Sequence, residues 1–158
     1  MSSLHETAYL RFKSELTDQE LRGIYTPTAA ENAFARQHRK QRLAQMALLG
    51  LLKTTQRLGF VPKLSDIPAP ILSHIAKHIG IVNFQRGRLT CYDQSGARQR
   101  LIELVRERLG IKAFASEGET LIEQTALQVA ETKQELADII NALIEILVRE
   151  RYELPGFS

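Results

Sequence analysis

The sequence lacks the features that mark exported or membrane-spanning chains. It has a single cysteine, Cys91, among its 158 residues, which excludes an internal disulfide framework and is typical of a reducing compartment. No run approaches the roughly 18 apolar residues of a membrane span, and charges throughout the first thirty residues leave no apolar core for a signal peptide. We therefore expect a soluble, cytoplasmic protein with no membrane partner.

Recognisable catalytic and cofactor-binding motifs are also missing. The sequence has no nucleophile motif, no phosphate-cradling glycine loop and no nucleotide-binding fingerprint. His74 and His78 have the helical spacing of two metal ligands, but Cys91, His5 and His38 are remote in sequence, so no third ligand is evident. We expect no metal, no cofactor and no enzyme activity in this chain by itself.

Acidic residues are scarce in the middle of the chain. Residues 36–112 hold fifteen Lys and Arg against four Asp and Glu, a net charge of +11, whereas residues 1–35 carry −2 and residues 113–158 carry −6. Clustered Lys and Arg bind polyanions because phosphate neutralisation releases counterions. Two interpretations fit this charge distribution about equally well. One is a nucleic-acid-binding surface, and the other is a self-complementary fold in which the acidic C-terminal helix packs across residues 36–112, the basic block.

Helix starts and stops are legible throughout. The capping pattern Ser/Thr-x-x-Glu occurs at Thr17, Thr28, Ser116 and Thr132, Ser95 is a fifth candidate N-cap, and Gly59, Gly80 and Gly110 each follow an apolar-periodic run. The predicted helices cover residues 18–24, 29–38, 40–58, 69–79, 96–109, 117–130 and 133–151. These seven helices predict a compact all-α array.

Two further features refine this architecture. The helix over 40–58 is apolar on nearly every side and should be the central core helix. Residues 81–92 are rich in β-prone side chains, so a short β-hairpin and an irregular loop are equally compatible with them. Because the sign of charge changes near residues 113–116, we expect a basic lobe over residues 1–112 and an acidic helical pair over 113–158.

The predicted helix over 69–79 has a small polar face with a basic bias. Opposite its buried isoleucines and leucine lie Ser73, His74, Lys77 and His78, side chains that can meet base edges and phosphates in a major groove. The connection from Gly59 to Pro68 is longer than that of a standard helix-turn-helix, so the element is only helix-turn-helix-like. A plain solvated face is the alternative.

The predicted helix over 96–109 carries four arginines, which are not equally good candidates for phosphate contacts. Glu103 lies three residues from both Arg100 and Arg106, so ion pairs within the helix can account for these two arginines. Arg108 lies in the last turn, where its positive charge interacts favourably with the helix dipole. The first turn is different, because free amides at a helix N-terminus favour anions. We expect phosphate contacts from its N-terminal residues and the two arginines upstream, namely Arg86, Arg88, Ser95, Arg98 and Arg100.

A wider electrostatic footprint is expected from other cations of the basic block, of which about half should matter. These are Arg39, Lys40, Arg42, Lys53, Arg57 and Lys63.

Several segments are similar to a known family. The runs QRLGFVP and DIPAPILSHIA, YDQSG followed by VRERLG, and the terminal RERYELPGF resemble the N-terminal domain of Tn-three family transposases, and the similarity extends over essentially the whole chain. The resemblance implies a bacterial helical domain that recognises the terminal inverted repeats of a transposon in replicative, cointegrate-forming transposition. Cutting and joining would belong to a separate metal-dependent catalytic domain of the same transposase.

The resemblance also implies partners. These are double-stranded DNA of the inverted repeats, the downstream catalytic domain and further copies in the assembled complex, with nucleoid association when DNA is bound. The alternative function is a protein-interaction or assembly module, in which the acidic last helix docks on another part of the transposase without direct DNA contact.

Overall fold

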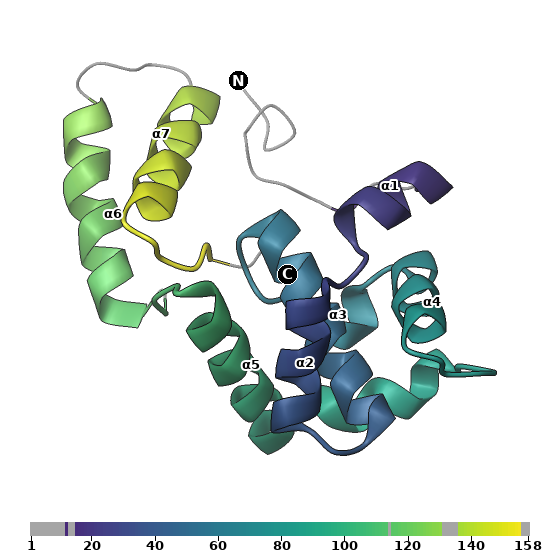
Figure 1. The fold of residues 1–158 in the computed structure, drawn as a ribbon. Coiled ribbons are helices and arrows are strands. Elements are labelled where there is room, and N and C mark those ends of the chain that lie inside the picture. Colours follow the sequence, from purple (N-terminus) through teal and green to yellow (C-terminus); the bar gives the residue numbers. More distant parts are fainter. Residues whose placement is uncertain (1–11, 13–14, 114, 131–135, 156–158) are drawn as a thin grey trace.

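The computed structural model describes residues 12, 15–113, 115–130 and 136–155, and their fold is all-α as predicted. The chain runs through α1 (Asp18–Ile24), α2 (Ala29–His38), α3 (Arg42–Leu58), the 3₁₀ helix η2 (Leu64–Asp66), α4 (Ala69–His78), the 3₁₀ helix η3 (Arg86–Asp93), α5 (Ser95–Leu109), α6 (Ala115–Ala130) and α7 (Leu136–Arg149). A first lobe of α1–α5 stands beside a second lobe formed by α6, α7 and residues 150–155 (Figure 1).

Helix α3 is the central core helix, as its composition predicts. Met46, Leu48, Leu51 and Leu52 are fully buried, and α2, α4 and α5 pack around them. Gly50 faces α4, and a Cβ at this position would meet a methyl group of Leu72 at 3.4 Å, an ordinary van der Waals contact. The core therefore fixes α4 against α3.

The capping signals account for several of the helix ends among the described residues. Thr28 and Glu31 form a complete capping box, the Thr17 side chain accepts a hydrogen bond from the Glu20 amide, and Gly59, Gly80 and Gly110 all have positive φ. The N-cap of α5 is Gln94 and not Ser95, which is the first helical residue, and α6 begins one residue before Ser116. The predicted cap at Thr132 lies outside the described residues.

The segment 81–92 does not form the β-hairpin considered from its composition. Residues Arg86–Asp93 are the 3₁₀ helix η3, because Leu89 is buried in the main core and the Asp93 carboxylate accepts hydrogen bonds from the amides of Leu64 (2.7 Å) and Ser65 (3.0 Å). These contacts hold η3 against η2.

The second lobe is joined to the first through the residues that follow α7. The Leu154 amide donates to the Gly59 carbonyl (2.7 Å), and Lys112 and Tyr152 form an isolated bridge. The Glu153 carboxylate accepts from Arg106 Nε (2.7 Å), so Arg106 is held by this acid and not by the predicted neighbour Glu103.

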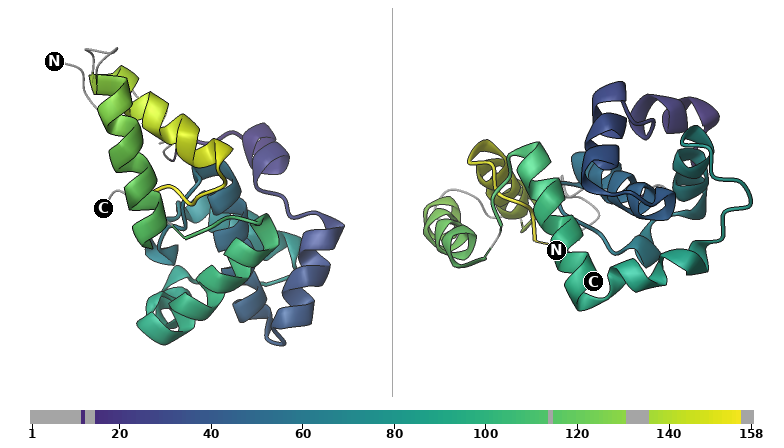
Figure 2. Two further views of the ribbon diagram at one scale, coloured as in Figure 1. Left: turned by 90° about the vertical axis from the view of Figure 1, so that its left-hand side faces the viewer. Right: turned by 60° about the horizontal axis from the view of Figure 1, so that its bottom comes forward.

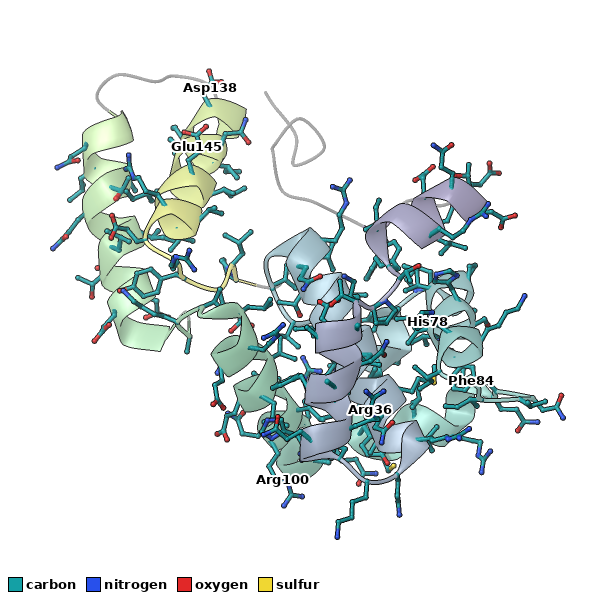
Figure 3. The ribbon with its side chains drawn as sticks, viewed as in Figure 1. Arg36, His78, Phe84, Arg100, Asp138 and Glu145 are labelled. Atoms are coloured by element: carbon teal, nitrogen blue, oxygen red, sulfur yellow. The ribbon has the colours of Figure 1, made fainter. Side chains whose placement is uncertain are left out.

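The acidic helices do not lie across the basic block. Helices α6 and α7 pack on each other to one side of the first lobe (Figures 1 and 2), and Asp138 and Glu145 of α7 lie far from Arg36 and Arg100 (Figure 3). Among the described residues, α6 and α7 therefore leave much of the surface of the first lobe uncovered.

Candidate nucleic-acid interface

Helix α4 presents a polar side to solvent as its sequence pattern predicts. Ile71, Leu72 and Ile75 are fully buried against the core, whereas Ser73, Lys77 and His78 are exposed and His74 is half-buried. The helix begins after Pro68 and has Pro70 in its first turn, where a missing amide proton costs nothing. The buried stripe thus fixes which side chains α4 offers to a ligand.

The exposed side of α4 borders two hollows that share His78. One, of about 430 Å³, lies between α1 and α4 and is lined by Asp18, Leu21, Arg22, His74, Lys77 and His78. The other, of about 280 Å³, lies between α2, α3 and α4 and is lined by Asn32, Arg36, Arg42, Gln45, Leu49, His78 and Ile79. We call the two hollows together the basic groove, because their charged lining includes four Lys or Arg and one acid.

Both histidines of α4 are tied to neighbouring elements. His74 Nε2 lies 2.8 Å from Thr26 Oγ1, and His78 Nε2 lies 3.3 Å from Asn32 Nδ2. Burial, together with the electrostatic effect of the neighbouring His78, Arg22 and Lys77 side chains, lowers the pKa of His74. The lowered pKa favours the neutral form of His74, and its contact with Thr26 ties α4 to the segment after α1, while His78 is exposed and lines both hollows.

Arg22, Arg36 and Asn32 are among the groove residues that were not predicted from the sequence. Arg22 of α1 and Arg36 and Asn32 of α2 come to α4 only through the packing of the first lobe. Arg36 was counted in the basic block, but nothing in the local pattern distinguishes it from any other exposed arginine. In Figure 3, Arg36 and His78 both lie on the side of the first lobe that faces the viewer.

The arginines around the start of α5 separate into two kinds. Arg98 donates to the carbonyls of Val61 and Pro62 (both 3.0 Å) and lies 3.8 Å from the Asp93 carboxylate, so its guanidinium holds the segment that follows α3. Arg86 donates to the Ser65 carbonyl. Arg88 and Arg100 are exposed, and they are the guanidinium groups of this set that the structure leaves facing solvent.

The six cations of the wider electrostatic footprint differ in their exposure and contacts. Lys53 is 7% exposed and its ammonium lies 3.1 Å from the Glu31 carboxylate, so it is engaged within the fold and we leave it out of the DNA-binding surface. Arg42 donates to the Gly80 carbonyl (3.3 Å) and Arg39 to that of His38 (2.7 Å). Three other cations of the footprint are exposed: Lys40, Arg57 and Lys63.

The described residues show neither a metal-binding cluster nor a membrane-spanning helix. No three His, Cys, Asp or Glu side chains of these residues come together in a way that could hold a metal ion. No helix in the same part of the chain is both long and apolar enough to cross a membrane.

Comparison with known proteins places the chain in one family. Neither a curated protein nor a solved structure matches it. A family model described as a domain of unknown function, DUF4158, matches residues 1–158, which is the whole sequence. The chain therefore belongs to the DUF4158 family.

Proposed function

We propose that the chain binds double-stranded DNA through α4 and the basic groove. The observation that carries this proposal is the convergence of Arg22, Arg36, Arg42 and Lys77, from four different helices, around one exposed polar helix face. An α-helix fits the major groove of B-DNA, and cations flanking such a helix meet the phosphates on either side. A helix face that was merely exposed to solvent would not require cations from four elements to converge on it.

The contacts of each side chain suggest its role. Lys77, Arg22 and Arg36 are exposed and suit phosphate positioning. Ser73 and His78 carry a hydroxyl and an imidazole on the exposed side of α4, and these groups suit base edges. Arg88 lies on η3 and Arg100 on α5, and these two elements pack against each other. The two arginines extend the electrostatic footprint beyond the groove.

The resemblance to Tn-three family transposases supports a more specific version of this function. In that version the DNA is the terminal inverted repeat of a transposon, and the chain is the end-reading part of a transposase whose catalytic domain lies elsewhere in the same protein. The chain then contributes recognition and no catalytic group of its own. Its other partners are the catalytic domain and further copies of the transposase.

The direct test is a titration of the chain against an inverted-repeat duplex and a scrambled duplex at several salt concentrations. If about five phosphates are engaged, log affinity falls with log salt at a slope near −4.5. A flat salt response, or no binding to either duplex, contradicts the proposal.

Substitutions separate positioning from reading. Arg36→Gln should weaken both duplexes alike and make the salt slope shallower by about 1, whereas Ser73→Ala and His78→Ala should mainly erode the preference for the inverted repeat. Arg149→Gln is the matched control, because Arg149 is an exposed arginine of α7 in the second lobe. Equal effects of Arg36→Gln and Arg149→Gln would remove the groove from the interface.

An assembly module remains the second candidate, and two side chains favour it. Leu127 of α6 is 74% exposed and Val148 of α7 is 58% exposed, so the second lobe offers apolar contacts to a protein. Under this function Leu127→Ser and Val148→Ser would weaken association with the remainder of the transposase and leave DNA affinity unchanged. Co-purification of the chain with the separately expressed catalytic domain measures this.

A further inference from the structure

The loop between α4 and η3, residues 81–85, projects from the first lobe beside α4 (Figures 1 and 2). Val82 in this loop is 79% exposed, more than any other large hydrophobic side chain in the part of the chain that the structure describes. It lies four residues beyond His78, which lines both hollows of the basic groove. The groove and the loop are therefore adjoining parts of one surface.

The residues on either side of Val82 hold the loop in place. Ile81 and Phe84 (labelled in Figure 3) are half-buried and pack against the main core. The Ile81 amide donates to the Ala76 carbonyl (2.8 Å). Asn83 has a φ of +55°, a left-handed conformation that asparagine tolerates and that turns the chain at this point. Val82 is thus an apolar side chain that its anchored neighbours hold away from the core.

The charge around the loop favours a polyanion over a protein as the partner. The chain has no acidic residue between Asp66 and Asp93, a stretch that includes all of α4 and the loop. Arg86 and Arg88 follow the loop directly, and Arg88 is exposed. The negative potential of a narrow minor groove attracts arginine side chains.

We propose that Val82 enters the minor groove of DNA held along α4 and opens one base step there, an inference that rests on the DNA-binding function proposed above. Major and minor grooves adjoin across a sugar-phosphate backbone, so a loop beside a helix in the major groove falls over the neighbouring minor groove. Apolar side chains that enter minor grooves work as wedges, which unstack a step and bend the duplex. Arg88 then contacts the phosphates that flank the opened step.

The test uses duplexes of the inverted repeat, and of a scrambled sequence, in which 2-aminopurine replaces one adenine at a time. This base fluoresces more strongly when it is unstacked. The wild-type chain should raise the fluorescence at one step of the bound duplex at least about twofold, and Val82→Ser should abolish that rise and weaken binding by about fivefold. Val82→Ile should retain both, because it keeps an apolar side chain of similar shape.

Leu127→Ser is the matched control, because Leu127 is 74% exposed but lies on α6 in the second lobe. It should leave both fluorescence and affinity at the wild-type level. Tight, salt-dependent binding with no fluorescence rise at any step, or with the same rise for Val82→Ser, overturns the wedge and leaves the DNA-binding function standing. Absence of binding to every duplex overturns both.

A photo-crosslinker placed at position 82 distinguishes the remaining partner class. Crosslinks to the duplex in a mixture of DNA and the transposase catalytic domain support the wedge. Crosslinks to protein alone would assign the loop to a protein contact and overturn it.

Discussion

Replacing Lys53 by Met should destabilise the fold without touching the DNA interface. Lys53 Nζ lies 3.1 Å from Glu31 Oε1, and both residues are buried, at 7% and 4% exposure. Removing one partner of a buried ion pair costs about 3–5 kcal/mol. The Glu31 carboxylate would keep its hydrogen bonds from the Gln56 side chain (2.6 Å) and the Thr28 amide (2.8 Å), which places the cost near the lower limit, about 3 kcal/mol.

Urea unfolding followed by far-UV circular dichroism suits this measurement, because the chain is helical and has no tryptophan. A loss of about 3 kcal/mol corresponds to a fall in Tm of roughly 6–12 °C for a chain of this size. Below the lower Tm, the folded Lys53→Met variant should bind DNA with the wild-type affinity. Lys40→Met is the contrasting variant, since Lys40 is exposed and its loss should change stability by less than about 0.5 kcal/mol.

The pH dependence gives a second check on the same pair. Burial pushes the pKa of Glu31 up, but the hydrogen bonds from Thr28, Gln56 and Lys53 outweigh burial and leave the pKa below its ordinary value of 4.5. The unfolded chain therefore binds the proton first as the pH falls. The stabilisation is complete above about pH 4.5 and is lost as the pH falls through the folded pKa.

Glu31→Gln should flatten that acid limb, and the double variant with Lys53→Met should be less destabilised than the sum of the two single variants. A cost below about 1 kcal/mol for Lys53→Met would refute the buried pair. So would a loss of DNA affinity in that variant with stability unchanged.

Three other outcomes follow from individual contacts. Arg98→Met should lower the free energy of unfolding by about 3 kcal/mol, because two hydrogen bonds from a charged donor to the Val61 and Pro62 carbonyls are lost. Arg100→Met should leave urea unfolding unchanged and weaken DNA binding. The reverse pattern would return Arg98 to the DNA interface. Arg151→Gly should raise the free energy of unfolding by up to about 1 kcal/mol, because Arg151, in the turn that follows α7, has a φ of +60°, and a lower urea midpoint would contradict this. Since the pKa of His74 is lowered in the fold, the unfolded chain takes up the proton first as the pH falls through 6.5. The free energy of unfolding should therefore decline below that pH in the wild type, and less steeply in His74→Gln. Parallel curves for the two proteins would show that His74 is not the group concerned.

The helices could be predicted because their signals are local. The Thr28–Glu31 box and the left-handed Gly59 and Gly110 act within one turn of the helix ends that they define, and the structure confirms them. The segment 81–92 gave no such local signal. Its form depends on the Asp93 carboxylate meeting the amides of Leu64 and Ser65, which no periodicity in residues 81–92 encodes.

The candidate site was only partly predictable for the same reason. The exposed side of α4 follows from its buried stripe, so Ser73, Lys77 and His78 were identified from spacing. The partners of Arg98 lie 36 and 37 residues away along the chain, and the partner of Arg106 lies 47 away. A sequence shows that an arginine is present, but whether it faces solvent or a carbonyl depends on contacts at that distance.

These internal contacts bear on the two interpretations that charge alone left open. Lys53, Arg98 and Arg106 of the basic block are engaged within the fold. Among the described acids of the C-terminal segment, Glu153 contacts the block, through Arg106 at the junction of the lobes. Asp138 and Glu145 of α7 are exposed and lie away from the first lobe (Figure 3). A self-complementary fold would have placed these carboxylates against the groove cations. In the described residues the acidic lobe instead leaves Arg22, Arg36 and Lys77 facing solvent, which is the arrangement that a polyanionic ligand requires.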